Sequence, residues 1–353
     1  MWSMDASLVT LYPLRFIPLA VERLWGGTAL EPLFPDAERS GDGRHPIGEV
    51  WTLVTHPTHA SRVANGPHRG RTLTELIAEA PERMLGALAP ADRFPLLVKF
   101  IDAAQDLSVQ VHPDDAYARR HENDWGKSEA WYILKAPEGG RIIAGHRFDS
   151  PDTYRRAVAE GRIREYLLEQ PIAAGELVYI PAGRVHALLG GTTVIEIQQP
   201  SDVTYRIYDW DRIDPVSGRP RPLHVDKAAD VIRYGDASVA EKSTTALRTP
   251  FFTLEKHALA AGERRRFAPV VAHRPEVIVV ADGEGGLVLD GREAPPREGT
   301  ADGPPGRTDD VTVLALRPGD TILVPADIPR YTVRTAKALV FLRAIPGPGG
   351  EVR

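Results

Sequence analysis

Four polar residues with the chemistry of metal ligands stand in strand-like, apolar sequence: Gln110, His112, Glu129 and His186. Gln110 and His112 alternate with valines, and because a strand repeats every two residues, both side chains point to one face. Glu129 opens a β-rich run after a polar turn, and His186 closes a strand that ends in a Pro/Gly turn. Two imidazoles, a carboxylate and an amide oxygen predict one N/O metal site suited to zinc, with manganese, cobalt or iron as substitutes.

Each of these residues taken alone is also typical of a hydrogen-bonded core or turn position. His186 has the most specific surroundings. Gly175, Pro181, Gly183 and His186 are spaced as in the second motif of the cupin β-barrel. In that motif the glycine opens a strand, the proline and glycine shape a turn, and the histidine points into the barrel mouth.

The composition is that of a globular chain with room for two domains of ordinary size. It has 353 residues, 42% of them hydrophobic and 26% charged. A net charge of −5 argues against nucleic acid as a partner, which normally requires a basic face. The absence of cysteine excludes disulfides and thiolate metal sites. The N-terminal sequence has neither a basic region nor a long apolar run, so we expect a cytoplasmic protein that does not bind a membrane.

Short β-rich runs separated by Gly, Pro and Asp predict a mainly β fold. Two stretches have helical patterns instead. Residues 72–88 open with Thr72 and Thr74 as possible caps, and residues 152–169 begin with Asp152 as a candidate N-cap after a proline. We expect these helices to cover a barrel mouth. The predicted strands are 15–18, 49–54, 96–101, 107–112, 130–134, 177–180, 193–198 and 204–208.

A composition shift and a weak internal repeat predict a second domain. Residues 175–186 and 319–331 share a glycine, an acidic residue, an apolar run and a Pro-Ala pair, with Arg330 in the place of His186. The alternative is that both are ordinary β-turn entries. We therefore expect residues 1–243 to form a metal-binding catalytic cupin domain with the two helical insertions. Residues 244–353 should form a smaller cupin-like β domain without metal ligands, with an exposed loop at 290–310.

Seven motifs, in order, resemble those of the type I mannose-6-phosphate isomerases in their short bacterial form. The resemblance covers roughly residues 12–235 and implies a jelly-roll cupin barrel with a smaller second β domain. One departure is Thr52, at a position where many relatives carry glutamate. The motifs are ERLWGGTAL (22–30), IGEVWTL (47–53), NGPHRGRTLTEL (65–76), LLVKFIDAAQDLSVQVHPDD (96–115), GKSEAWYIL (126–134), VYIPAGRVHAL (178–188) and IEIQQPSDVTYRIYDWDR (195–212).

The resemblance implies a zinc site formed by the same four residues, Gln110, His112, Glu129 and His186. It also implies a catalytic arginine at Arg206, in TYRIYD, and a working lysine at Lys127, in GKSEAW. An arginine presents a planar fork to an enediolate or phosphate oxygen. Without the resemblance, Arg206 is as well explained as a surface residue.

Further residues are assigned to catalysis or to substrate binding. Glu196 is a candidate proton shuttle, because burial raises the pKa of a carboxyl, or else an acceptor that orients a ligand histidine. Ser108, Lys99 and Arg212 are candidate substrate-binding residues. Lys99 is equally consistent with a strand lysine that extends to solvent, and Arg212 with a surface salt-bridge cluster.

The predicted activity is the interconversion of mannose 6-phosphate and fructose 6-phosphate through a cis-enediol, with one zinc ion per chain. The predicted partner is therefore a small sugar phosphate, and the chain is expected to be a monomer or a homodimer. Two alternatives remain: a cupin metalloenzyme of another class, such as an iron oxygenase, and a non-catalytic cupin that binds sugar phosphates. Oxygenases usually use three histidines, or two histidines and a carboxylate, with open positions.

Overall fold

Strands dominate the chain, as the sequence predicts. The computed structural model describes residues 10–91, 93–268, 273–289 and 313–347, so the expected loop at 290–310 lies outside the described residues. The chain divides into two compact units. Of the described residues, 17–61, 93–255 and 346–347 form the larger unit, and 10–16, 62–91, 256–268, 273–289 and 313–345 form the smaller unit.

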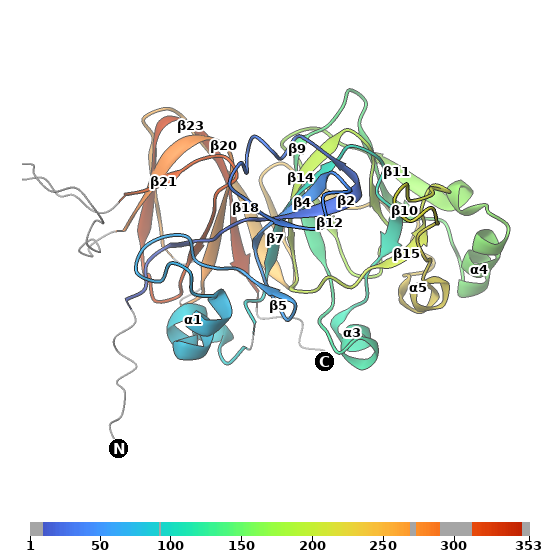
Figure 1. Ribbon diagram of the computed structural model, residues 1–353, viewed down its shortest axis with the longest axis horizontal. Coiled ribbons are helices and arrows are strands. Elements are labelled where there is room, and N and C mark those ends of the chain that lie inside the picture. The colour runs from blue at the N-terminus through green and yellow to red at the C-terminus, as the bar shows by residue number, and fades with distance from the viewer. Residues whose placement is uncertain (1–9, 92, 269–272, 290–312, 348–353) are drawn as a thin grey trace, which may run out of the picture. The chain divides into compact units, whose positions relative to one another are not determined.

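The larger unit has one eight-stranded sheet, in which all but one pair of neighbours are antiparallel (Figure 1). Its central strands are buried along their whole length, so polar side chains on them must find partners inside the protein. The sheet is open at both ends and does not close into a barrel by hydrogen bonding. In spatial order the strands are β16 (Glu241–Ser243), β12 (Leu177–Ile180), β9 (Glu129–Lys135), β14 (Thr192–Gln198), β7 (Leu97–Ala103), β4 (Ile47–Leu53), β2 (Leu19–Gly27) and β3 (Glu38–Ser40).

Shorter strands of the larger unit form further small sheets. β11 (Leu167–Pro171), β10 (Arg141–His146) and β13 (Ala187–Leu188) pair in that order, and β15 (Tyr205–Tyr208) pairs with β8 (Val109–Val111). A bridge between Gln110 and His186 links the second of these sheets to the segment before β13. The remaining elements of this unit are β5 (Thr55–His56), β6 (His59–Ala60), β17 (Ala246–Arg248), α3 (Asp115–His121), α4 (Pro151–Ala159), η3 (Ile163–Tyr166) and α5 (Val225–Val231).

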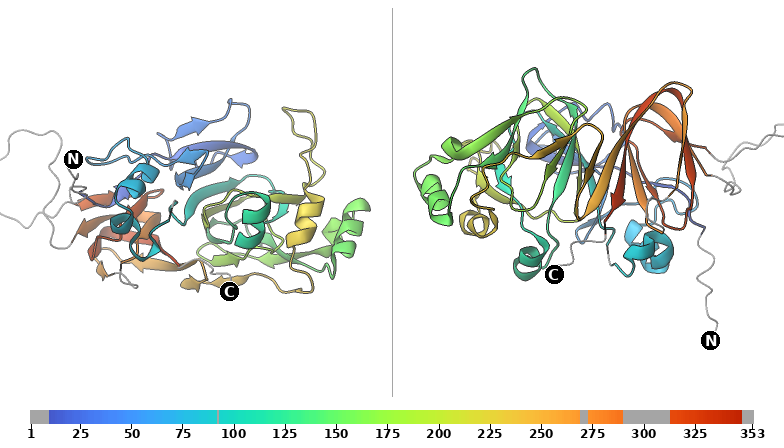
Figure 2. Two further views of the ribbon diagram at one scale, coloured as in Figure 1. Left: turned by 90° about the horizontal axis from the view of Figure 1, so that it is seen from below. Right: turned by 180° about the vertical axis from the view of Figure 1, so that it is seen from behind.

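The smaller unit is built on two long neighbouring strands, β20 (Glu276–Leu289) and β23 (Tyr331–Pro346), drawn in orange and red in Figure 2. Side chains of these strands, among them Ile278, Phe341 and Tyr331, belong to a compact apolar core. The other elements are β1 (Leu14–Arg15), β18 (Phe252–Leu259, which continues from the larger unit), β19 (Arg264–Phe267), β21 (Val313–Leu316), β22 (Thr321–Val324), α1 (Leu73–Glu79), α2 (Pro81–Leu85) and η2 (Gly86–Leu88).

The division into units differs from the boundary expected at residue 243. Residues 62–92 group with the C-terminal strands, so the helical stretch 72–88 is part of the smaller unit. Its contacts explain this. Arg83 forms an ion pair with Asp327 at 2.8 Å, and Ala326 N donates to Met84 O at 3.1 Å. These contacts join segments far apart in sequence, and no local pattern reports them.

The two predicted helices are shorter than their apolar patterns. Thr72 caps α1 through a capping box with Glu75, as expected, but Pro81 ends that helix because a proline disfavours helical geometry in the residue before it. In the second stretch the N-cap is Ser150, which accepts a hydrogen bond from Thr153 N, and not Asp152. The expected continuation to residue 169 is wrong, because residues 167–171 pair as β11 with β10. Among the described residues, none of the helices has the length and apolar character needed to cross a membrane.

Candidate metal centre and active site

The larger unit brings the four predicted metal ligands together. Gln110 lies in β8 and His112 directly follows it, while Glu129 begins β9 and His186 precedes β13. Ligand atoms of His112, Glu129 and His186 all lie within 4.8 Å of one another, and all three side chains are buried. The carboxamide Nε2 of Gln110 lies 3.3 Å from His186 Nε2. Residues spread over 77 positions of sequence thus meet at one point (from 110 to 186).

Backbone carbonyls determine which nitrogen of each imidazole faces the cluster. His112 Nδ1 lies 2.9 Å from Val203 O, and His186 Nδ1 lies 2.8 Å from Arg184 O. A carbonyl oxygen only accepts, so each Nδ1 carries the proton and each Nε2 presents its lone pair to the cluster. Burial and then the charge of Lys127 lower the pKa of His112; for His186, burial lowers the pKa to about 3. Both rings are therefore neutral near pH 7, the state that binds a metal.

These donor atoms fit a divalent cation. The two oxygens of Glu129 face His186 Nε2 at 3.3 Å and His112 Nε2 at 3.4 Å, so electron pairs point at electron pairs. Glu129 Oε1 is buried and has no hydrogen-bond partner. Burial opposes ionisation of this carboxyl, but opposing causes, the largest of which is the charge of Lys127, outweigh it and hold its pKa well below the usual value. A buried carboxylate and two imidazole lone pairs converging in this way are stabilised by a bound cation.

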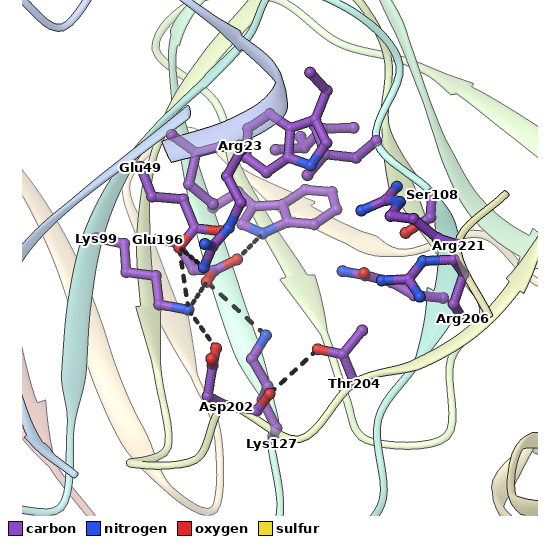
Figure 3. A pocket seen from close by; sticks show the side chains of 16 residues that line it. Arg23, Glu49, Lys99, Ser108, Lys127, Glu196, Asp202, Thr204, Arg206 and Arg221 are labelled. Atoms are coloured by element: carbon purple, nitrogen blue, oxygen red, sulfur yellow. Dashed lines mark hydrogen bonds and ion pairs between the residues drawn. The ribbon is translucent and has the colours of Figure 1, made fainter. Parts of the chain in front are cut away.

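A cavity of about 350 Å³ adjoins this cluster, and Gln110 and Lys127 belong to its lining (Figure 3). The lining combines the aromatic side chains of Trp25 and Trp131 with polar and charged side chains. The Lys127 ammonium contacts Glu129, lies 3.1 Å from His112 Nε2 and lies 3.9 Å from Glu196. Lys127 therefore stands between the metal ligands and the cavity.

One wall is a row of side chains from neighbouring strands at the same level of the sheet. Lys99 of β7 pairs with Glu196 of β14, and Glu196 pairs with Trp131 of β9. Trp51 of β4, which does not line the cavity, is the partner of Lys99 on the other side. Lys99 Nζ is buried and lies 3.0 Å from Asp202 and 3.9 Å from Glu196. The sequence predicts that Lys99 and Glu196 each lie on a strand, but it does not pair the two strands. The observed pairing register makes the two residues neighbours.

Glu196 has the environment of a proton-transfer group. Burial, followed by the charge of Glu129, raises its pKa to about 7, although Lys127 and Lys99 oppose the shift. Its Oε2 accepts a hydrogen bond from Trp131 Nε1 at 2.9 Å, which fixes the carboxyl orientation. A carboxyl that is partly ionised near neutral pH can both accept and return a proton.

The opposite wall carries guanidinium groups and Ser108 (Figure 3). Arg206 of β15 pairs in register with Gln110 of β8, which places it beside a candidate metal ligand. Burial and the neighbouring Arg221 lower the pKa of Arg206 to about 10, and its buried Nε has no hydrogen-bond partner. The charge of Asp209 favours the charged form of Arg206, and Nη1 donates to the carbonyl of Pro222 at 2.9 Å. A partly buried guanidinium whose Nε is left without a partner favours an anionic ligand.

Arg212, predicted to bind substrate, is not among the cavity-lining residues. Its guanidinium forms an ion pair with Asp209 at 2.6 Å and donates to Asp106 O. Arg221 lines the cavity instead and is held by the same carboxylate through two hydrogen bonds. Arg221 lies in a Gly/Pro-rich loop whose sequence carries no periodicity, so only the folded chain shows its position.

Sequence reasoning also missed three other charged residues of the cavity, Arg23, Glu49 and Asp202. Arg23 donates to both oxygens of Glu49 at 3.0 Å, and Trp51 Nε1 donates to Glu49 at 2.7 Å. Charged residues inside the apolar motifs ERLWGG and IGEVW were an available signal. Thr52 is buried in β4, bonds the carbonyl of Val98 and does not line the cavity.

The strand pairing around the metal cluster of the larger unit has a counterpart in the smaller unit, where it surrounds a different group of side chains. Glu129 pairs with Ile180 of β12, and Glu276 pairs with Val324 of β22, the residue that matches Ile180 in the sequence repeat. The register of β23 then places Arg343 opposite Ile278, just as Glu196 stands opposite Trp131. The repeat thus extends to strand pairing, which the ordinary β-turn alternative does not require.

In this second cluster Arg343 and Tyr331 surround Glu276. Arg343 donates to both oxygens of Glu276, with Nε at 2.9 Å, and the Tyr331 hydroxyl donates at 2.6 Å. Arg330, expected to occupy the place of His186, is exposed, and Tyr331 is the buried side chain at this turn. Because successive side chains of a strand point to opposite faces, a shift of one residue puts Tyr331, and not Arg330, on the buried face. A guanidinium therefore neutralises the carboxylate that corresponds to Glu129.

Comparison with known proteins agrees with this geometry. Residues 14–155 match the family model "Phosphomannose isomerase type I, catalytic domain". The mannose-6-phosphate isomerase ManA of Bacillus subtilis is 36% identical over 297 residues, which is 79% of this chain and 89% of that protein. The chain belongs to the type I phosphomannose isomerase family.

Solved structures show that the likeness of this family member extends over its whole length. The crystal structure of the mannose 6-phosphate isomerase from Bacillus subtilis matches with a TM-score of 0.76 and 31% identity, over 94% of this chain and 99% of that one. A zinc-bound mannose 6-phosphate isomerase matches with a TM-score of 0.67 and 16% identity, over 95% of this chain and 99% of that one. The second match concerns the fold alone.

Proposed function

We propose that this phosphomannose isomerase family member interconverts mannose 6-phosphate and fructose 6-phosphate, with zinc held by Gln110, His112, Glu129 and His186. The observation that carries the proposal is the convergence of two neutral imidazoles and a buried carboxylate beside a cavity lined by lysine and arginine side chains. The printed function of ManA and the zinc in a structure of the same fold support the substrate and the metal. A bound divalent cation would supply Lewis-acid polarisation and a template for the sugar oxygens.

The reaction moves one proton between C2 and C1 and a second between O2 and O1 of the open-chain sugar through a cis-enediol, with no net oxidation. Glu196 is the proposed base: its carboxylate takes the proton from C2 of mannose 6-phosphate and returns it to C1, and the reverse holds for fructose 6-phosphate. A carboxyl with a pKa of about 7 has the right strength for both transfers. Lys127, between Glu196 and the ligand set, donates hydrogen bonds to the sugar oxygens as negative charge develops.

The cationic wall binds the charged parts of the substrate. Arg206, which pairs in register with Gln110, is the proposed partner of the enediolate oxygens, and Arg221 and Ser108 are the proposed partners of the phosphate. Lys99 binds sugar hydroxyls together with its partner Asp202. Arg212 contributes through Asp209, which it shares with Arg221. Ser108 and Lys99 therefore remain proposed direct ligands of the substrate, whereas Arg212 does not.

Metal removal tests this proposal. Protein purified without a metal-affinity tag is expected to contain about one equivalent of zinc and to form fructose 6-phosphate from mannose 6-phosphate in deuterated water. Dialysis against a chelator should abolish turnover, and added zinc should restore it. Metal content by mass spectrometry and product by NMR are the measurements. Full turnover in metal-free protein would contradict the zinc site, and no turnover with zinc present would contradict the activity.

Arg206→Lys is expected to slow turnover by about two orders of magnitude, a loss of about 3 kcal/mol in transition-state stabilisation. A lysine keeps the charge but cannot present a planar fork to two oxygens. The measurement is kcat and KM for mannose 6-phosphate. Arg164→Lys, on the exposed side of the same unit against Tyr208, is the matched control and should keep normal kinetics. A near-normal rate in Arg206→Lys would return this residue to a surface role.

A further inference from the structure

A turn formed by residues 199–203 connects β14 to β15 and contacts a candidate metal ligand. The carbonyl of Val203 in this turn is the acceptor for His112 Nδ1 at 2.9 Å. A hydrogen bond of this kind fixes the tautomer and the orientation of a ligand ring. In the same turn Asp202 forms the 3.0 Å ion pair with Lys99 of the cavity. The position of this turn therefore affects both the metal ligand and the substrate wall.

Ser201 stabilises the turn by hydrogen bonds and has no exposed surface. Its Oγ accepts a hydrogen bond from Val203 N at 3.2 Å and donates one to Asp124 Oδ2 at 3.1 Å. Burial disfavours the charged form of Asp124, but contacts with His56, Arg93 and Ser201 outweigh it and lower the pKa to about 2. Because an ionised carboxylate only accepts, Ser201 must be the donor, and its lone pairs are left for Val203 N.

Asp124 is itself held from outside the turn. Arg93 Nη1 donates to its other oxygen at 2.6 Å, and the side chains of both residues are largely buried. Asp124 lies ahead of the segment that carries Lys127 and Glu129, so its contact with Ser201 joins two stretches that both serve the metal cluster. Neither Asp124 nor Ser201 lines the cavity.

Gln199 makes a second link between the turn and the ligand strand. Its Oε1 accepts from Ser128 N at 2.9 Å, and its Nε2 donates to Asp115 at 3.0 Å. Ser128 stands between Lys127 and Glu129 in the sequence. The start of β9 and the turn are thus fixed to one another by buried hydrogen bonds, which are costly to break.

We infer that Ser201 and Asp124 are positioning residues: they hold the Val203 carbonyl against His112 and thereby fix the imidazole for metal binding. This inference rests on the proposed metal centre. The residues act through the turn and touch neither metal nor substrate. Loss of the Ser201 hydrogen bonds should allow the Val203 carbonyl to move away from His112 Nδ1. The His112 ring would then sample orientations in which Nε2 no longer faces Glu129.

Ser201→Ala is expected to weaken zinc binding ten-fold or more, the range found when partners of ligand histidines are removed. Zinc affinity is measured by competition with a chromophoric chelator, independently of turnover. Asp124→Asn keeps the shape of the side chain but removes the charge, and it should change affinity in the same direction. Both variants should also displace Asp202, which lies in the same turn. At saturating zinc, they should therefore raise KM for mannose 6-phosphate more than they lower kcat.

Ser150→Ala provides the matched control, since it deletes the same hydroxyl in the same unit. Ser150 caps α4 through Thr153 N at 3.2 Å, so its loss should reduce stability and leave zinc affinity unchanged. If the unaltered protein binds no zinc, the proposed metal centre is wrong. If it binds zinc and both Asp124→Asn and any folded Ser201→Ala bind it equally well, the positioning role is overturned. Should Ser201→Ala not fold, Asp124→Asn decides alone.

Discussion

His186→Ala is expected to eliminate tight zinc binding and to reduce isomerase turnover below detection while leaving a folded β protein. The variant removes one of three converging electron-pair donors and leaves Glu129 with a free oxygen in a buried site. The apolar core of the larger unit is formed by other side chains, of which Trp131 contacts the His186 ring edge-on. His112→Ala should behave in the same way. Metal content, circular dichroism and product formation on mannose 6-phosphate are the measurements.

His146→Ala is the matched control for this prediction. His146 is also a buried histidine of the larger unit, but its ring stacks on Phe148 and lies outside the ligand set. Its replacement should cost stability through lost packing and leave one zinc per chain. Normal metal content and turnover in His186→Ala would show that this residue is not a ligand.

Arg343→Ala is expected to lower the free energy of unfolding of the smaller unit by about 3–5 kcal/mol, because it leaves Glu276 buried without its cation. Tyr331 cannot replace the missing cation, because its hydroxyl is neutral: burial and the neighbouring Glu276 raise its pKa well above the usual value. Chemical denaturation followed by fluorescence and circular dichroism measures the loss. Zinc stoichiometry should stay unchanged in whatever fraction remains folded.

Two further variants separate charge from packing in this cluster. Arg330→Ala removes an exposed arginine one residue from Tyr331 and should change stability by no more than about 0.5 kcal/mol. Arg343→Met combined with Glu276→Met removes both charges and should recover much of the loss, as apolar replacements of buried ion pairs do. Equal stability of Arg343→Ala and the unaltered protein would show that the guanidinium does not neutralise Glu276. A second zinc equivalent lost with Arg343 would contradict a metal-free smaller unit.

Local patterns were sufficient for much of the larger unit. The two-residue period of a strand placed Gln110 and His112 on one face, and the Gly/Pro spacing around His186 predicted a turn that aims the ring inward. In the smaller unit, Thr72 was predicted as a cap and is one. The helix expected over 152–169 failed where β10 offers a pairing partner, since strand hydrogen bonds with a distant segment outweigh a weak amphipathic preference.

By itself the sequence determined the mainly β fold, the kinds of side chain that could bind a metal and the family resemblance that the comparisons confirmed. These depend on residue type and on spacing within single segments. Only the tertiary structure decided that Lys99 stands beside Glu196, that Arg221 rather than Arg212 lines the cavity, and that residues 62–92 belong with the C-terminal strands. Strand register and long-range ion pairs set these positions, and neither is encoded in the period of any one segment.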